Sequence, residues 1–409
     1  MPAALGSNET IAPAADPLVG LPYRALQLLG AGGMGEVFLA EHRELGKLSV
    51  VKILHARFAG DERLADRVRL EARTLGRIRS PYIVSVSGAG VTADGRPFIV
   101  MEYLEGRTVA EELEQRGHLP VLEALKYACE LLHALEVAHT AGIVHRDIKP
   151  GNLFLCDAPD GTRTLKVVDF GLTRIMPDAP PGAPQPLAVP TDTGIVVGTP
   201  RYMSPEGARA QPVDHRADLY GASLVLYLML AGRGPFDHIR SERMVLSAHA
   251  GEKPQPPSHF AKQPIPPELD RVVLYTLRKD PADRFQTAAA FREQLEQIKA
   301  QLERALTALE TTAYDAAWFA DPPHSTSDSA PPIDLHAIDQ AAALPPRAHE
   351  GAALPVPSSG AFPKHVRPSP QTHVQRPIAH LHVALIFLCA LLVAAATSAG
   401  LLALLQGAR

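Results

Sequence analysis

The segment IVHRDIKPGNLFL, residues 143–155, places five kinds of polar side chain between two apolar ends. His, Arg, Asp, Lys and Asn all occur within the eight positions from His145 to Asn152. A core segment could bury this mixture only with paired partners, so a purely structural role is a poor explanation. The segment therefore predicts a site of chemistry, in which Asp147 accepts a hydroxyl proton and Lys149 offsets charge on a moving group.

A further acidic residue, Asp169, follows directly on the β-prone pair Val167-Val168 in the stretch LKVVDFGLTR. Carboxylate and amide oxygens are hard ligands of the kind that Mg²⁺ prefers. We therefore expect Asn152 and Asp169 to hold Mg²⁺, with Mn²⁺ as an alternative ion.

The stretch LLGAGGMGEVFLAEH, residues 28–42, contains four glycines within six positions. Such a cluster costs conformational entropy, and its G-x-G-x-x-G spacing alone fits a dinucleotide turn, a phosphate loop or nothing functional. A dinucleotide turn runs into a helix, whereas VFLA after Gly35 is typical of a strand. The missing G-K-[ST] excludes a Walker loop. We expect a hairpin whose bare backbone approaches phosphate groups.

A lysine in the middle of an apolar, β-prone run, SVVKIL, requires an anionic partner. Lys52 is this residue, and Glu71 on the following helical stretch is a candidate partner. A structural ion pair is one explanation, and binding of nucleotide α- and β-phosphates is the other.

Together these motifs resemble those of eukaryotic-type (Hanks-type) protein kinases, and in detail those of bacterial membrane-anchored Ser/Thr kinases. The resemblance covers about Tyr23–Leu295 and implies an α+β, two-lobed fold with a small sheet lobe, which carries one helix, and a mainly helical lobe. It implies ATP and Mg²⁺ as cofactors, with Asp147 as base, Lys149 as the Ser/Thr-type lysine, and Asn152 and Asp169 as metal ligands. The implied nucleotide site comprises Leu29, Gly30, Ala31, Gly32, Gly33, Met34, Gly35, Glu36, Val37, Lys52 and Glu71, with Glu102 and Leu104 of the hinge.

The same resemblance implies three supporting features of the second lobe. Glu206 should pair with Arg284, and Asp218 should brace the catalytic loop. Ser223 replaces a family glycine in a buried helix, and we expect its hydroxyl to bond a carbonyl one turn earlier. Another departure, Val50 in place of a small alanine above adenine, is expected to shift nucleotide affinity without abolishing binding.

The stretch TDTGIVVGT, residues 191–199, follows a proline-rich insert and resembles the autophosphorylated segment of the bacterial relatives. We expect Thr191 and Thr193 to be phosphorylated, with Arg146 available to bind the phosphate, and a homodimer to support the reaction in trans. The expected substrates are Ser and Thr hydroxyls of proteins. A pseudokinase scaffold and a membrane-tethered adaptor that recruits partners through its proline-rich linker are the alternatives, and the complete set of catalytic residues argues against the pseudokinase.

The net charge and the segments outside the kinase-like part give further expectations. A net charge of −4 over 409 residues does not indicate a nucleic-acid-binding protein. Residues 381–405 are apolar over a length that can span a bilayer, and the upstream basic residues predict that the kinase part faces the cytoplasm from the inner membrane. The expected divisions are a disordered tail (1–22), two lobes (23–105 and 106–297), a helical extension (298–314), a proline-rich linker (315–380), a single transmembrane helix (381–405) and a short tail (406–409).

Overall fold

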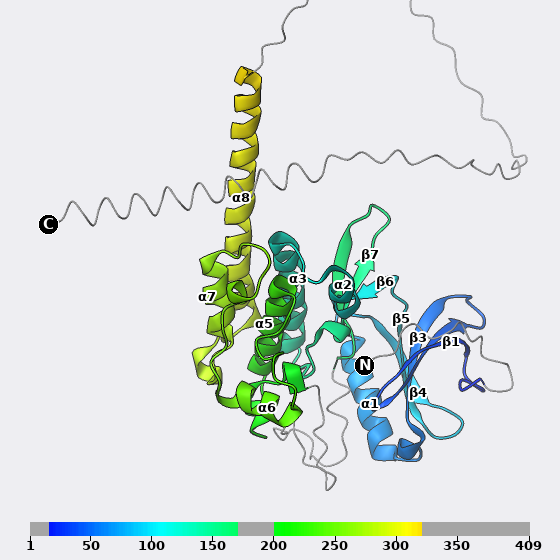
Figure 1. Ribbon diagram of the computed structural model, residues 1–409. Coiled ribbons are helices and arrows are strands. Elements are labelled where there is room, and N and C mark those ends of the chain that lie inside the picture. The colour runs from blue at the N-terminus through cyan, green and yellow to red at the C-terminus, as the bar shows by residue number, and fades with distance from the viewer. Residues whose placement is uncertain (1–15, 171–199, 321–409) are drawn as a thin grey trace, which may run out of the picture. The chain divides into compact units, whose positions relative to one another are not determined.

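A computed structural model of the chain describes residues 16–170 and 200–320, with the backbone alone for 309–320. In the first part, short apolar runs form a five-stranded antiparallel sheet (Figure 1). In sheet order these strands are β1 (Tyr23–Ala31), β2 (Gly35–His42), β3 (Leu48–Leu54), β5 (Pro97–Glu102) and β4 (Val86–Val91). A turn at Asp94-Gly95 joins β4 to β5, and Gly95 adopts a φ of 82° there.

Strand β3 shows how the sheet places Lys52. Because side chains alternate along a strand, Val51 and Ile53 pack into a cluster on one face. Val50 and Leu54 pack into another cluster on the opposite face, together with residues of helix α1 (Glu62–Leu75). Lys52 lies between Val50 and Leu54 and therefore shares their face of the sheet.

The N-terminal tail predicted over residues 1–22 is structured from Asp16 onward. Leu18 is fully buried against the sheet. The Asp16 carboxylate accepts hydrogen bonds from the Leu18 N–H at 2.9 Å and from Arg43 at 3.1 Å. Burial of one leucine and these charge-assisted bonds account for the order of residues 16–22, while residues 1–15 lie outside the described part.

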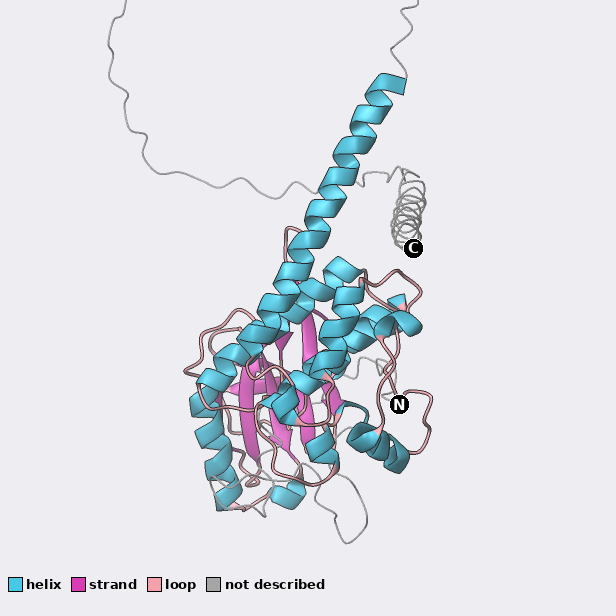
Figure 2. Ribbon diagram, turned by 90° about the vertical axis from the view of Figure 1, so that its left-hand side faces the viewer, coloured by secondary structure: helices cyan, strands magenta, loops and turns pink. Residues whose placement is uncertain are grey.

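The second part is mainly helical and carries a small three-stranded sheet in the order β6-β7-β8 (Figures 1 and 2). Its elements are β6 (Gly106–Thr108), α2 (Val109–Arg116), α3 (Val121–Thr140), β7 (Leu153–Asp157), β8 (Arg163–Val167), α4 (Pro205–Ala208), α5 (Arg216–Ala231), α6 (Glu242–Gly251), α7 (Pro267–Thr276) and α8 (Ala288–Ala320). Short 3₁₀ turns occur at Ala56–Phe58, Pro150–Asn152, Pro200–Tyr202, Pro257–His259 and Pro281–Asp283. Helices α3, α5 and α8 enclose the largest hydrophobic core.

Local sequence signals explain several helix ends in this part. Thr108 and Glu111 form a capping box at the start of α2. Helix α5 ends at Gly232, whose φ of 72° is left-handed and suits glycine. The expectation for Ser223 is wrong: its hydroxyl donates to the Val273 carbonyl of α7 at 3.1 Å, because α7 packs closely against α5.

Helix α8 packs against α3, and its C-terminal half extends away from the other helices (Figure 2). It continues to Ala320, six residues beyond the predicted end of the extension at residue 314. The added residues, 315–320, contain neither glycine nor proline, which are the residues that most disfavour a helix. Within residues 16–170 and 200–320, no helix is long and apolar enough to cross a membrane. The predicted span 381–405, most of the linker and the 406–409 tail lie outside these residues.

Candidate active site

The loop between α3 and β7 brings the three predicted catalytic-loop residues together. Lys149 Nζ donates to Asp147 Oδ2 at 2.6 Å. The Asn152 amide nitrogen donates to the same oxygen at 3.0 Å and to the Asp147 carbonyl at 2.8 Å. The Asp147 side chain keeps 18% of its surface exposed, so an external hydroxyl can reach its carboxylate.

Asp218 supports this loop from the first turn of α5, as predicted. Its buried carboxylate accepts the backbone N–H groups of His145 and Arg146, both at 2.7 Å, and His139 Nε2 lies 2.9 Å away. Burial alone would raise the pKa of Asp218, but the hydrogen bond from His139 and the other neighbouring donors outweigh it and lower that pKa. Arg146 is held in a left-handed conformation, with a φ of 67°.

His145 joins the catalytic loop to the segment that contains Asp169. Its Nε2 donates to the Val168 carbonyl at 3.0 Å, which leaves Nδ1 to accept the Asp147 N–H at 3.2 Å. Its ring also lies against the buried ring of Phe170, with centroids 4.6 Å apart. The single His145 side chain therefore fixes the positions of Asp147 and of the residues around Asp169 relative to each other.

The two predicted metal ligands lie at the ends of neighbouring strands. The Val168 N–H donates to the Asn152 carbonyl at 2.9 Å, and β7 pairs with β8 directly beyond this bond. The Asn152 amide nitrogen makes the contacts with Asp147, so the amide oxygen is the atom of this side chain that could ligate a metal. Amide and carboxylate oxygens are hard donors of the kind that Mg²⁺ prefers, so the chemistry of Asn152 and Asp169 fits this ion.

The strand lysine reaches across to the second part of the chain. Lys52 Nζ lies 2.9 Å from Asp169 Oδ1, and its side chain is 12% exposed. Glu71, its predicted partner, lies half-buried on α1. The cation thus stands beside a proposed metal ligand, where an anionic phosphate would also be attracted to it.

The glycine loop forms the hairpin expected between β1 and β2. The Gly32 N–H donates to the Gly35 carbonyl at 2.9 Å and closes the turn. A Cβ atom built on Gly30, Gly32 or Gly33 would meet no atom within 4 Å. The same atom on Gly35 would lie 2.1 Å from the Ile53 carbonyl oxygen, so Gly35 serves the approach of β2 to β3.

A small apolar cluster lies between the sheet and the hinge. Met101 is buried, and Val50, Leu104 and Val168 pack partly buried around it. These side chains offer an apolar surface of the kind that receives a planar base. Leu29 is exposed and Val37 is half-buried on the two strands of the glycine loop.

The hinge contains an ion pair that the sequence motifs did not predict. Glu102 Oε1 accepts from Lys166 Nζ of β8 at 2.7 Å and from the Ser85 N–H at 2.8 Å. Nothing in the local sequence pairs Lys166 with a residue 64 positions earlier. The bridge ties the first hinge residue to the second part of the chain.

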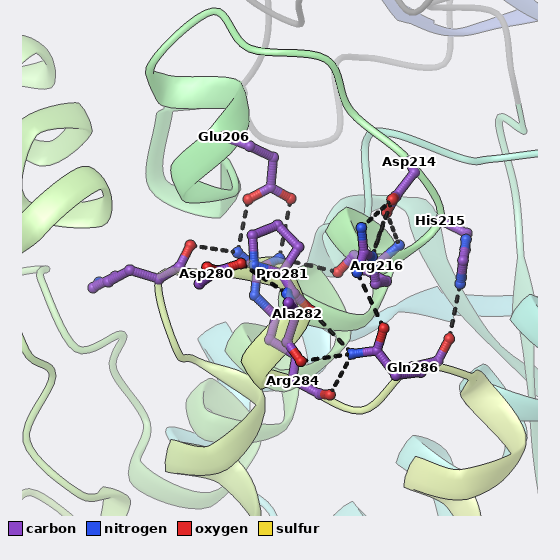
Figure 3. A network of polar contacts seen from close by, with 10 residues as sticks. Glu206, Asp214, His215, Arg216, Asp280, Pro281, Ala282, Arg284 and Gln286 are labelled. Carbon is purple, nitrogen blue, oxygen red and sulfur yellow. Dashed lines mark hydrogen bonds and ion pairs between the residues drawn. The ribbon is translucent and has the colours of Figure 1, made fainter.

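The predicted pair of Glu206 and Arg284 is confirmed (Figure 3). Two parallel bonds of 3.0 and 2.7 Å join them, and their side chains are 5% and 0% exposed. Arg284 also donates to the backbone carbonyls of Arg278 and Lys279. The buried pair fixes α4, which directly follows the segment of the predicted phosphorylation sites Thr191 and Thr193; both threonines lie outside the described residues.

Comparison with known proteins identifies relatives of this arrangement. The family model of the protein kinase domain matches residues 23–295. The chain is 35% identical to serine/threonine-protein kinase pkn3 of Myxococcus xanthus, over 75% of this chain and 55% of that protein. It is 38% identical to serine/threonine-protein kinase PknB of Mycobacterium leprae, over 67% of this chain and 42% of that protein. The chain thus spans about half the length of these curated relatives. The crystal structure of the Mycobacterium tuberculosis PknI kinase domain matches with a TM-score of 0.51 and 28% identity, over 72% of this chain and 99% of that domain.

Proposed function

Because this chain belongs to the protein kinase family, we propose that it is an ATP-dependent serine/threonine protein kinase in bacterial signal transduction. The observation that carries the proposal is the hydrogen-bonded group of Asp147, Lys149 and Asn152, placed beside Asp169. The names of the curated relatives, which are serine/threonine-protein kinases of bacteria, support the same class of acceptor.

Each residue of the site has a role in the proposed transfer of phosphate from ATP. The acceptor oxygen forms a bond to the γ-phosphorus while the bond to the β–γ bridging oxygen breaks, ADP leaves, and Asp147 receives the hydroxyl proton. Lys149 offsets charge on the group in transfer, and Lys52 binds the α- and β-phosphates. Asn152 and Asp169 would hold Mg²⁺, or Mn²⁺ in its place, and the ion would supply positive charge to neutralise the phosphates.

The test compares purified full-length protein with its Asp147→Asn variant, using radiolabelled ATP, Mg²⁺ and casein as a general acceptor. Loss of the base is expected to reduce transfer by about 100-fold or more. Asp66→Asn is the matched control, because Asp66 is 74% exposed on α1 and is not one of the predicted site residues. Transfer by Asp147→Asn at the wild-type rate would refute the proposal.

We further propose that phosphorylation of Thr191 and Thr193, performed in trans within a homodimer, raises the activity. The sequence resemblance of this segment to that of bacterial kinases supports the proposal. A Thr191→Ala/Thr193→Ala protein is expected to lose most of its activity after preincubation with ATP. Full retention of activity would contradict it.

We also propose that residues 381–405 anchor the protein in the inner membrane as a single-pass helix, with the kinase part in the cytoplasm. The length of the apolar run and the upstream basic residues support this arrangement. Full-length protein is expected in the membrane fraction of a lysate, and a variant that ends at residue 380 in the soluble fraction. Equal distribution of the two would contradict the anchor.

A further inference from the structure

The tip of the glycine loop is attached to the connection between β3 and α1. His55 Nε2 lies 2.6 Å from the Gly32 carbonyl oxygen, and the His55 N–H donates to the Met34 carbonyl at 3.1 Å. The Arg57 guanidinium donates to the Gly33 carbonyl. Three consecutive carbonyl groups of the tip are thus engaged by two residues that lie more than twenty positions further along the chain.

These contacts determine where the N–H groups of the tip point. The described peptide bonds are all trans, and in a trans peptide the C=O and the following N–H point in opposite directions. The carbonyl groups of Gly32, Gly33 and Met34 face His55 and Arg57. The N–H group of the residue that follows each of them therefore points away from His55 and Arg57. Successive N–H groups that point to one side form a concave site for an anion.

The anchoring residues are themselves held in place. His55 follows the last residue of β3, and Arg57 lies in the 3₁₀ turn Ala56–Phe58. The Arg57 guanidinium lies over the Phe58 ring, 4.8 Å from its centroid, and Phe58 packs into the cluster between the sheet and α1. Gly32 and Gly33 leave open space around the tip that a side chain would occupy. The loop tip is therefore oriented before any ligand arrives.

We infer that His55 and Arg57 are positioning residues for the β- and γ-phosphates of the nucleotide. Both act through the loop: they hold the carbonyls of the tip so that its N–H groups donate to phosphate oxygens. The inference rests on the proposed kinase function, and it predicts that the two residues matter for the phosphate part of ATP and leave recognition of adenine and ribose unchanged.

The test measures the binding of adenosine, ADP and ATP to full-length protein by calorimetry in the presence of Mg²⁺. Loss of both side-chain donors in His55→Ala/Arg57→Ala is expected to weaken ADP and ATP by about 5- to 20-fold and to leave adenosine within two-fold. His55→Gln/Arg57→Lys retains a donor at each position and is expected to restore most of the affinity. Arg63→Ala removes an exposed cation from α1 and serves as the control for charge.

The outcomes separate the inference from the function on which it rests. An equal loss for adenosine and ADP would indicate general damage to the first lobe and overturn the inference, as would unchanged ADP binding. Failure of His55→Gln/Arg57→Lys to recover affinity would overturn the role of the hydrogen bonds. Phosphate transfer to casein by the wild type and by Arg63→Ala reports separately on the proposed kinase function.

Discussion

Substitution of Gly35 is expected to lower the stability of the protein, whereas substitution of Gly32 in the same loop is expected to affect ATP use. A Cβ on Gly35 would lie 2.1 Å from the Ile53 oxygen, 2.9 Å from the Ile53 carbonyl carbon and 3.0 Å from the Leu54 Cα. All three are backbone atoms of β3, and Gly35 stands opposite Leu54 in the ladder between β2 and β3. No change of rotamer can relieve the contact, so Gly35→Ala must separate the strands or distort them.

The size of the effect follows from the geometry. A carbon and a carbonyl oxygen approach to about 3.3 Å at closest, so the strands must move apart by about 1 Å. Overpacking of this kind costs about 1–3 kcal/mol, and a rigid backbone neighbour places Gly35→Ala at about 3 kcal/mol. For a domain of this size that loss lowers the melting temperature by about 6–12 °C.

Gly32→Ala provides the matched comparison. A Cβ on Gly32 meets nothing within 4 Å, so the melting temperature is expected to stay within about 2 °C of the wild type. Its effect should instead be on the Michaelis constant for ATP, because the added methyl group occupies space beside the phosphates. The melting temperatures of Gly32→Ala and Gly35→Ala are measured by circular dichroism, and their Michaelis constants for ATP are measured by phosphate transfer. Equal melting temperatures for Gly35→Ala and the wild type would refute the steric argument.

Two further predictions concern buried groups of the second lobe. Arg284→Met leaves the Glu206 carboxylate buried without its partner and should lower the free energy of unfolding by about 3–5 kcal/mol. The double variant Arg284→Met/Glu206→Gln should lose less than the sum of the two single losses. A loss equal to that sum, measured by urea denaturation, would contradict the pairing. Burial lowers the pKa of His249 to about 4. When the pH falls from 7.5 to 5, the unfolded chain therefore takes up a proton at this histidine that the folded chain does not. The free energy of unfolding should fall by about 2 kcal/mol over this range. His249→Gln can keep the bonds to Tyr220 and the Arg201 carbonyl and should remove this part of the pH dependence; an unchanged difference between the two pH values would contradict the assignment.

The family resemblance implied two long-range contacts, of Glu206 with Arg284 and of Asp218 with the catalytic loop. The other parts of the fold that could be predicted depend on short stretches of sequence. The capping box of Thr108 and Glu111 involves residues three positions apart, and the end of α5 at Gly232 depends on one left-handed residue. The alternation of side chains along residues 48–54 likewise places Lys52 on one face of the sheet. Each of these features is determined by backbone geometry over a few residues, which is the range over which sequence patterns are informative.

The contacts that could not be predicted join residues far apart in the chain. The bridge between Glu102 and Lys166 and the anchoring of the glycine loop by His55 and Arg57 depend on which strands and turns meet in space. By their spacing, Gly32 and Gly35 have the same predicted role, because spacing does not reveal what lies next to a missing side chain. Only the position of the β3 backbone separates them.

The candidate site combines local strain with support from the core. Arg146 and Asp169 both adopt left-handed conformations, with φ of 67° and 59°, which cost about 1–2 kcal/mol each for residues other than glycine. Asp218 offsets the first, because its buried carboxylate accepts the N–H group of Arg146 itself and that of His145 directly before it. His145 bonds the carbonyl just before Asp169 and so limits the freedom of the second. The directions of the Asp147 and Asp169 side chains are therefore set by buried groups of α5 and the catalytic loop, and a substitution at Asp218 would act on the reaction through geometry without touching a reacting atom.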